Sequence, residues 1–405
     1  MTLLKKLGPG LLFAGAAIGV SHLVQSTRAG ADFGFGLIWA LLLVHVCKYP
    51  FFQFGPRYAI ATGESLLDGY LKLGKPILIT YFVLNLATMF TIQTAVTIVT
   101  AGLAANLFGI TSNPAIWSIL ITVICLLILL IGRFKLLDIL MKIIIITLTI
   151  STIAAVILAY TKNANTIPLT QIFPKETTDI AFLIAFMGWM PAPLDVTIWQ
   201  SLWTLEKRKN TKNYNASNVI TDFNIGYAST IVIGCLFIAL GALVMFNSQE
   251  NFSGNATIFS AQLIQMYTQS LGQYTHFIIA IAAFTTMFST TITTLDASPR
   301  AMSYSSKLLM GKQIKYSYAL WMSILITGTL VILLFFISEM KTLIEIATIL
   351  SFVTAPFYAI INYKLITSSH TPAFYRPRKA MRILSWSGIL FLIGFSVWYI
   401  TSITM

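Results

Sequence analysis

Long apolar stretches separated by short polar segments run along the whole chain. Each is close to the roughly 20 residues that a helix needs to cross a bilayer. The stretches are continuous rather than alternating, which favours membrane helices over the strands of a β-barrel. There are eleven, at about 9–29, 36–61, 76–106, 116–132, 136–160, 179–203, 223–247, 273–297, 316–337, 342–366 and 383–402. The pattern predicts an all-α polytopic membrane protein, built as a single transmembrane domain over residues 1–405.

Two of these stretches are interrupted near their middle. The first stalls at Gly19-Val20-Ser21-His22, and the sixth contains "MGWMPAP" at 187–193. The two prolines of the sixth stretch remove backbone donors and clash with the preceding turn. Because the interruptions lie five helices apart, they predict an inverted repeat with a binding site where the breaks meet. We expect repeat one at about 9–160, repeat two at about 179–366 and an extra helix at about 383–402.

A helix broken at membrane depth exposes backbone groups that protein must enclose. The first half of such a helix ends in free carbonyls, and the second half begins with free N–H groups and a positive dipole end. The paired breaks therefore predict a site for a small ion, either a cation on carbonyls or an anion on amides. The predicted lining residues are Gly19, Val20, Ser21, His22, Met187, Trp189, Met190 and Ala192. The alternative is a pair of kinks that bind nothing.

The basic residues gather in alternate loops, beginning with Lys5 and Lys6 before the first stretch. Only 10% of residues are charged and 57% are hydrophobic, yet the net charge is +13. By the positive-inside rule, this asymmetry places the N-terminus in the cytoplasm and the C-terminus outside. The charge thus reflects topology and not a nucleic-acid partner. We expect a protein of a prokaryotic inner membrane, a monomer or weak oligomer, with polar loops at 204–222 and 248–272.

Several motifs resemble, in order and spacing, those of the Nramp transporters. They are "GPGLLFAGAAIG", "RAGADFGFGLIWALLL", "RYAIATGESL", "NLFGI", "GRFKLLDILMK", the "MP" of the sixth stretch and "STTITT" of the eighth. The similarity runs from residue 8 to about residue 366. The resemblance implies a LeuT-type fold (the APC superfold) with a 5+5 inverted repeat. It also implies alternating access and, usually, proton-coupled uptake of manganese or iron.

The binding site departs from the pattern of that family. Where the family carries Asp-Pro-Gly-Asn in the first helix, this chain has Gly19-Val20-Ser21-His22, and where the family has a His in the sixth helix it has Ala192. The acidic pair of the family's third helix is replaced by Gln93 and Val96, and the Gln of its tenth helix by Thr348. A divalent cation stripped of water prefers oxygen ligands that include a carboxylate. The usual metal-ligand set is therefore absent, although Met190 and Pro191 of the sixth helix remain.

Without these carboxylates, the positive helix ends favour a small inorganic anion. Bicarbonate is the specific prediction, because it is planar and monovalent. The alternative is a divalent or softer metal ion bound by Met190, His22 and backbone carbonyls. No enzyme motif occurs, and a channel would require a continuous polar stripe along several helices.

Other polar residues within the apolar stretches are candidates for electrostatic or coupling roles. Lys48 lies far from either membrane interface, so it either shapes the substrate field or pairs with Asp195. His22 and His45 can carry protons. The LeuT-type fold implies a sodium site at Thr286, Ser289 and Thr290, and the alternative is hydrogen bonding within their own helix. We expect co-transport of Na⁺ or H⁺ and no bound cofactor.

Overall fold

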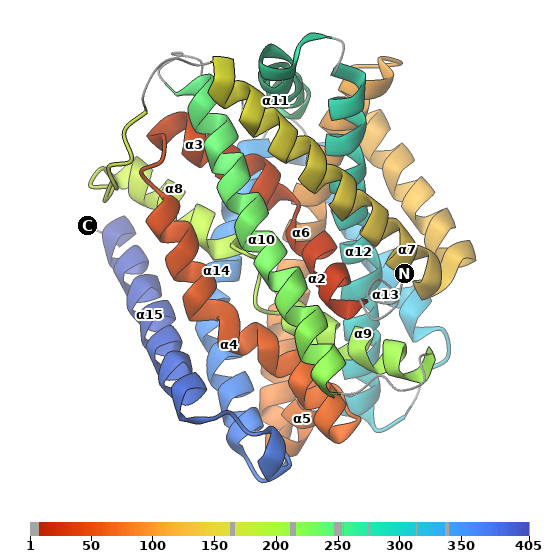
Figure 1. Ribbon diagram of the computed structural model, residues 1–405. Coiled ribbons are helices and arrows are strands. Elements are labelled where there is room, and N and C mark those ends of the chain that lie inside the picture. Colours follow the sequence, from red (N-terminus) through yellow and green to blue (C-terminus); the bar gives the residue numbers. More distant parts are fainter. Residues whose placement is uncertain are drawn as a thin grey trace.

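The computed structural model describes residues 8–162, 167–210, 216–246, 253, 255–273, 276–312, 314–336 and 340–404. In these ranges the chain forms one bundle of helices (Figure 1). Its helices are α2 (Pro9–Ala17), η1 (Val20–Ser26), α3 (Thr27–Phe33), α4 (Ile38–Thr62), α5 (Leu66–Leu73), α6 (Lys75–Phe108), α7 (Pro114–Lys162), α8 (Thr177–Trp189), α9 (Val196–Asn210), α10 (Ala216–Met245), α11 (Ala256–Leu271), α12 (His276–Met310), α13 (Ser317–Phe336), α14 (Met340–Thr367), η3 (Ala373–Tyr375) and α15 (Lys379–Thr404).

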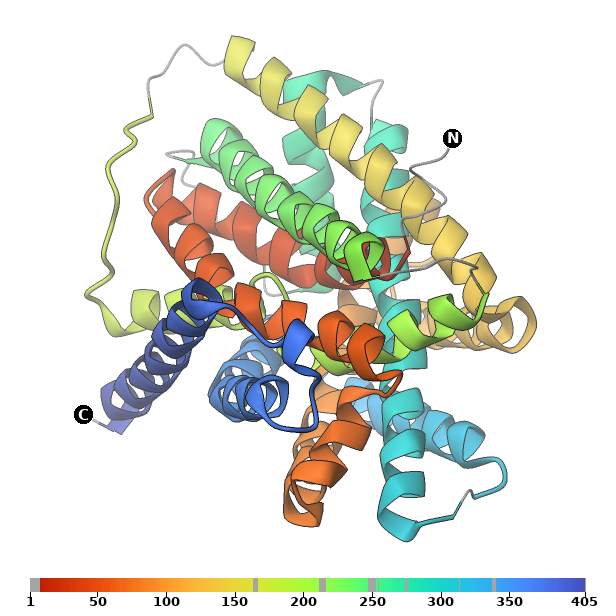
Figure 2. The same cartoon turned by 60° about the horizontal axis from the view of Figure 1, so that its bottom comes forward.

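The eleven predicted membrane stretches all appear as helices. Within the described residues, nine helices are long and apolar enough to cross a membrane, and two shorter apolar helices are Pro114–Leu130 and Thr177–Trp189. Together they match the predicted stretches one to one. The fourth and fifth stretches both belong to α7, whose gold first part and yellow second part run in different directions (Figures 1 and 2).

Two segments predicted as loops are partly helical, which corrects the sequence analysis. The segment 248–272 contains α11, whose first turn is capped by the Asn255 side chain accepting from the amides of Thr257 and Ile258. One face of α11 buries Phe259 and Leu263 completely. The segment 204–222 is mostly the end of α9 and the start of α10, and residues 211–215 between them lie outside the described part.

Small residues let the first broken helix pack directly against α10, which crosses it in Figure 1. A Cβ atom on Gly10 would collide with the backbone of Asp222, and one on Gly226 would collide with the backbone of Gly10. The Asp222 carboxylate also accepts hydrogen bonds from the amides of Gly8 (3.0 Å) and Gly10 (2.9 Å). These bonds satisfy free N–H groups at the start of α2 and fix its position on α10.

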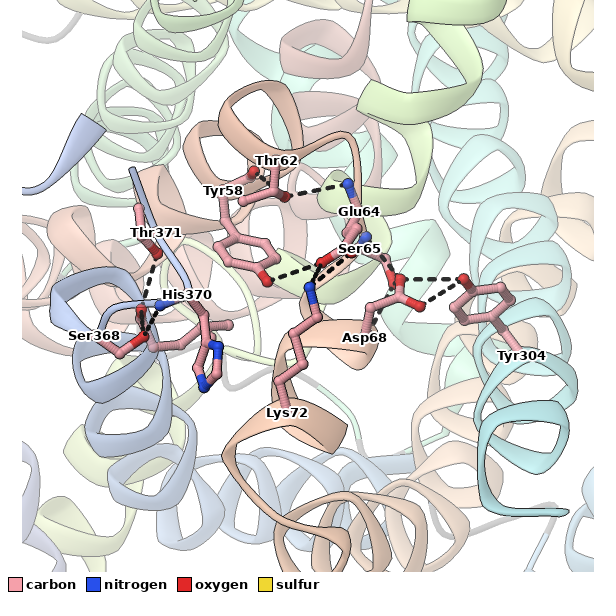
Figure 3. A network of polar contacts seen from close by, with 11 residues as sticks. Tyr58, Thr62, Glu64, Ser65, Asp68, Lys72, Tyr304, Ser368, His370 and Thr371 are labelled. Carbon is pink, nitrogen blue, oxygen red and sulfur yellow. Dashed lines mark hydrogen bonds and ion pairs between the residues drawn. The ribbon is translucent and has the colours of Figure 1, made fainter. Parts of the chain in front are cut away.

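A polar network fixes the connection between α4 and α6 at the end of the bundle where α5 lies, hereafter the α5 end (Figure 3). Ser65 and Asp68 form a capping box at the start of α5. Asp68 also accepts a hydrogen bond of 2.9 Å from the hydroxyl of Tyr304 on α12, and Lys72 forms an ion pair with Glu64. The network therefore joins α5 to α12 beside the turn after α4.

Candidate functional site

The first helix breaks between α2 and η1. α2 ends at Ala17, Ile18 leaves the helical conformation, and the chain resumes at Val20 as a π-helix. A Cβ atom on Gly19 would lie 2.6 Å from the Thr290 hydroxyl of α12. Glycine at this position therefore allows α12 to approach the break closely.

Several oxygen atoms converge beside this break. The Thr290 hydroxyl lies 3.2 Å from the Gly15 carbonyl oxygen, 3.5 Å from that of Ile18 and 3.4 Å from that of Thr286. A hydroxyl has one proton to donate, so it cannot satisfy all three carbonyls at once. Such a group of uncharged oxygens suits a hard cation. Of the three predicted sodium-site residues, Thr290 thus faces the break, whereas the hydroxyls of Thr286 and Ser289 donate to carbonyls of their own helix.

The sixth helix breaks between α8 and α9, and its free carbonyls are held by a lysine. Met190 is extended, and helix resumes at Val196. The Lys48 ammonium of α4 donates to the carbonyl oxygens of Met187 (3.0 Å), Gly188 (2.7 Å) and Met190 (2.9 Å). These three bonds use all three ammonium donors. The positive charge therefore lies at the negative end of the α8 dipole.

These contacts show that Lys48 does not pair with Asp195. Its side chain is completely buried, and its nitrogen lies 5.8 Å from the centre of the Phe352 ring. Its hydrogen bonds go to the break itself and not to Asp195. Asp195 directly precedes α9 and is 4% exposed, and one of its carboxylate oxygens has no hydrogen-bond partner in the described part of the chain. The Lys48–Asp195 ion pair, one of the two alternatives, is not formed.

A small cavity of about 30 Å³ lies between the two breaks. It is lined by Ala16, Ala17, Val20, Ser21, Ile92, Val96, Trp189, Ala192, Pro193, Val196, Trp199, Thr290 and Thr294. Most of these side chains are apolar, and the volume is enough for about one water molecule. The predicted site residues Val20, Ser21, Trp189 and Ala192 thus come together around one closed space.

Other predicted lining residues pack outside that cavity. A Cβ atom on Gly188 would lie 2.5 Å from the Thr348 carbonyl oxygen, so α8 and α14 touch closely there. The Thr348 hydroxyl donates to the Ile344 carbonyl of its own helix at 2.8 Å. Met187 and Met190 are fully buried and contribute their carbonyl oxygens to Lys48.

The two predicted histidines lie near each other between the first helix, α4 and α10. The ring of His22 is 6.5 Å from that of His45 and meets it edge to face. His22 Nε2 lies 3.1 Å from the Thr230 carbonyl oxygen, and Nδ1 lies 2.8 Å from the Ser21 hydroxyl. His45 Nδ1 donates to the Leu41 carbonyl at 2.7 Å. The His22 ring is therefore held by neighbouring groups and is not among the residues that line the cavity.

Gln93 connects α6 to α12 behind the cavity. Its amide oxygen accepts from the Thr294 hydroxyl at 2.7 Å, and its amide nitrogen donates to the Thr291 carbonyl at 3.4 Å. Thr294 ends the motif "STTITT" but was given no role of its own, and the sequence analysis did not identify Ser351, which accepts a 2.7 Å bond from the Trp189 indole. Their only signal was polarity within an apolar stretch. In the part of the chain that the structure describes, no group of three or more His, Cys, Asp or Glu side chains can hold a metal ion.

Two half-helices that face each other across a closed cavity define the class of broken-helix membrane transporters. The sequence model of the family described as "Natural resistance-associated macrophage protein-like", Nramp, matches residues 10–402. The chain belongs to the Nramp family of transporters. This confirms the family predicted from the motifs.

Curated relatives cover nearly the whole chain. An uncharacterized protein of Pasteurella multocida, PM0681, is 35% identical over 402 residues, which is 97% of this chain and 91% of that protein. The divalent metal cation transporter MntH of Staphylococcus saprophyticus is 25% identical over 411 residues, covering 95% of this chain and 89% of the relative.

Solved structures confirm the LeuT-type fold. A manganese transporter of Eremococcus coleocola, in complex with an aromatic bis-isothiourea compound, superposes with a TM-score of 0.74 at 13% identity, covering 100% of this chain and 95% of that one. Mhp1, a nucleobase-cation-symport-1 family transporter, superposes with a TM-score of 0.61 at 14% identity, covering 98% and 92%. At these identities the likeness concerns the fold alone.

Proposed function

We propose that this protein is an ion-coupled transporter that carries a small metal cation across a bacterial inner membrane. The observation that carries the proposal is the small cavity between two helix breaks, beside the carbonyl oxygens of Gly15 and Ile18. The relatives named as divalent metal cation transporters support the same class of cargo. Alternating access would expose this cavity to one side of the membrane and then to the other.

The cargo would be held without a carboxylate in direct contact. Ser21 lines the cavity, and the free backbone carbonyls beside it supply further oxygen ligands, whereas Met190 does not line it. The negative dipole end of α2 supplies part of the charge compensation, which is weaker than a full carboxylate charge. We therefore expect weaker divalent binding than in a site that contains a carboxylate.

Coupling to sodium is supported by the oxygen cluster around Thr290. Its members are a threonine hydroxyl and the carbonyls of Gly15, Ile18 and Thr286, all uncharged. An uncharged oxygen shell suits a monovalent hard cation. A sodium ion bound there would join the end of α2 to α12 and so favour one orientation of the first helix. From the positive-inside pattern we further propose that the α5 end faces the cytoplasm.

Uptake into liposomes that contain the purified protein tests the proposal. We expect manganese to accumulate when a sodium or proton gradient is imposed, and not in protein-free vesicles. A Gly19→Val variant is a suitable inactive control, because its side chain would collide with Thr290 at the break. Absence of metal flux under every gradient, with the protein folded, would contradict the cation proposal.

A small anion such as bicarbonate is the second candidate, and positive charge near the route favours it. Lys48 places an ammonium group at the helix-six break. A cavity of about 790 Å³ at the α5 end is lined by four basic residues, Arg208, Lys209, Arg300 and Lys307, although Glu206 also lines it. Labelled bicarbonate in the same liposomes separates the two candidates. Bicarbonate flux without manganese flux would support the anion.

A further inference from the structure

Three carboxylates are buried in the part of the chain that the structure describes, and they differ in how they are compensated. Asp222 accepts two backbone hydrogen bonds at the start of α2. Asp296 forms a two-point ion pair with Arg300, with contacts of 2.6 and 3.1 Å. Asp195 has no basic partner within these residues, and one of its oxygens has no hydrogen bond. A buried carboxylate without a basic partner within a membrane bundle is costly and is a candidate functional group.

A cluster of tyrosines from three other helices lies near Asp195. Tyr70 of α5, Tyr81 of α6 and Tyr358 of α14 are all buried and interact electrostatically with its carboxylate. The rings of Tyr70 and Tyr81 are 6.0 Å apart, and those of Tyr81 and Tyr358 are 6.3 Å apart. The Tyr70 hydroxyl donates to the Asn362 side-chain oxygen at 2.6 Å. A carboxylate, phenols and an amide thus form one buried polar cluster.

Many polar atoms in this region have no protein partner. Within the described residues, unsatisfied buried atoms include the Tyr81 hydroxyl, both amide atoms of Asn85 and of Gln200, the Asn362 amide nitrogen, and the indole nitrogens of Trp199 and Trp203. Buried polar groups are almost always hydrogen-bonded, to water where protein does not reach them. The groups on α9 lead toward the α5 end, where Leu202 and Trp203 line the large cavity. Water bound at these atoms would give Asp195 a hydrated route to the surface.

We propose that Asp195 binds the proton that drives transport, and that the surrounding phenol and amide groups pass it to and from the α5 end. The proton comes from water in the path, binds a carboxylate oxygen of Asp195, and returns to water when the site opens. The cluster contains one carboxylate and no second acidic or imidazole ligand, so a proton suits it better than a metal ion. This inference rests on the proposed function, because it supplies a driving ion for that transport.

The position of Asp195 connects proton binding to the helix-six break. The ionised carboxylate is stabilised by the positive N-terminal end of α9, and protonation removes that interaction. The break begins at Met190, whose carbonyl oxygen binds Lys48 at 2.9 Å. Among the described residues, the titratable groups that interact electrostatically with Asp195 are Tyr70, Tyr81 and Tyr358, and Lys48 binds the Met190 carbonyl of the break. Protonation can therefore shift the orientation of α9 relative to α8 without any contact with the cargo.

An Asp195→Asn variant tests the proposal in liposomes, because asparagine keeps the shape and cannot ionise. We expect accumulation driven by a pH gradient to fall at least tenfold, whereas exchange of labelled for unlabelled substrate across the membrane, which needs no driving ion, is retained. Asp179→Asn, at a half-buried position in the first turn of α8, is the matched control and should behave as the wild type. Proton-driven accumulation that survives in Asp195→Asn overturns the proposal. If Asp195→Asn instead abolishes accumulation driven by a sodium gradient, the ligand of Asp195 is not a proton and the proposal is wrong.

A measurement independent of transport separates this inference from the proposed function. We expect the infrared band of a protonated carboxyl group to titrate with pH in the purified wild-type protein and to be missing in Asp195→Asn. An unchanged band contradicts proton binding at Asp195 even if metal transport is demonstrated. If the Asp195 variant fails to fold, Tyr81→Phe removes only the adjacent hydroxyl. It should slow proton-driven uptake severalfold, and an unchanged rate counts against the path.

Discussion

The two helix breaks expose the same kind of backbone group but satisfy it differently. At the sixth helix, one ammonium donates to three carbonyl oxygens at 2.7 to 3.0 Å. At the first helix, one Thr290 hydroxyl lies among three carbonyl oxygens at 3.2 to 3.5 Å. Charge-assisted hydrogen bonds are shorter and about twice as strong as neutral ones. The break in the sixth helix is therefore held by an ammonium group, and the break in the first is not.

This difference assigns separate roles to the two halves of an inverted repeat. The Lys48 ammonium is covalently attached to α4 and cannot diffuse away from the carbonyl oxygens at the end of α8. We refer to this contact, between Lys48 and the carbonyls of Met187, Gly188 and Met190, as the fixed joint. The oxygens at the end of α2 have no such occupant and can exchange a mobile cation. The comparison predicts that variants at the end of α8 mainly change stability, whereas variants at the end of α2 mainly change transport.

Replacing the tethered cation is expected to have the largest effect on stability. Lys48→Met leaves three buried carbonyl oxygens without a donor, and we expect a loss of about 3–5 kcal/mol, as for removal of one partner from a buried ionic group. Lys72→Met is the control, because the Lys72–Glu64 ion pair is partly exposed and such pairs contribute about 0–1 kcal/mol. Thermal unfolding in detergent measures both. Equal melting temperatures for Lys48→Met and the wild type would show that the joint is not stabilised in this way.

Adding a methyl group at each break gives the next largest effect. In Gly188→Ala the new atom meets the Thr348 backbone oxygen at 2.5 Å, whereas in Gly19→Ala it meets the rotatable Thr290 side chain at 2.6 Å. Overpacking typically costs about 1–3 kcal/mol. We expect Gly188→Ala to reach that range and Gly19→Ala to stay below it, with uptake lost in Gly19→Ala all the same. The reverse order of melting temperatures would contradict the comparison.

The membrane helices could be predicted from sequence because apolar length is a property of the chain itself. The breaks could also be predicted, since glycine, proline and polar residues interrupt those stretches. α11 was missed because its sequence mixes Ser, Thr and Gln with the apolar residues that face the bundle. Its helical character depends on packing against α6 and α7. Amphipathic helices of this kind give a weaker signal than continuous apolar runs.

The chemistry of the site was less predictable, because it depends on contacts between distant segments. Lys48 was identified as a functional candidate. Its partners at the end of α8 lie 139 or more residues away in the sequence, and only the fold brings them into contact. The same holds for Asp195, whose tyrosine neighbours come from α5, α6 and α14. His22 was predicted to contact the substrate. The sequence could not show that its Nε2 atom lies against the Thr230 carbonyl oxygen of α10.

Releasing the start of the first helix is expected to have a moderate effect. Asp222→Ala removes the acceptor of the amides of Gly8 and Gly10, and loss of a helix N-cap typically costs about 1–2 kcal/mol. The first helix then loses one of its anchors on α10, so we expect slower uptake together with the lower melting temperature. Asp222→Asn retains an acceptor and should recover most of the stability. If the asparagine variant is as unstable as the alanine variant, the negative charge and not the hydrogen bonding is what matters.

The smallest effect on stability, and the sharpest on coupling, is expected at Thr290. Its contacts with the carbonyl oxygens are long, so Thr290→Val should cost no more than about 1 kcal/mol. Thr293→Val is the matched control, because the buried Thr293 hydroxyl donates at 2.7 Å to the Ser289 carbonyl of its own helix. If a mobile sodium ion binds at the first break, Thr290→Val loses one oxygen ligand. Stimulation of uptake by sodium should then require severalfold more sodium than in Thr293→Val. An identical sodium dependence in the two variants would show that no exchangeable cation binds at the first break. The proposed functional difference between the two breaks would then be wrong.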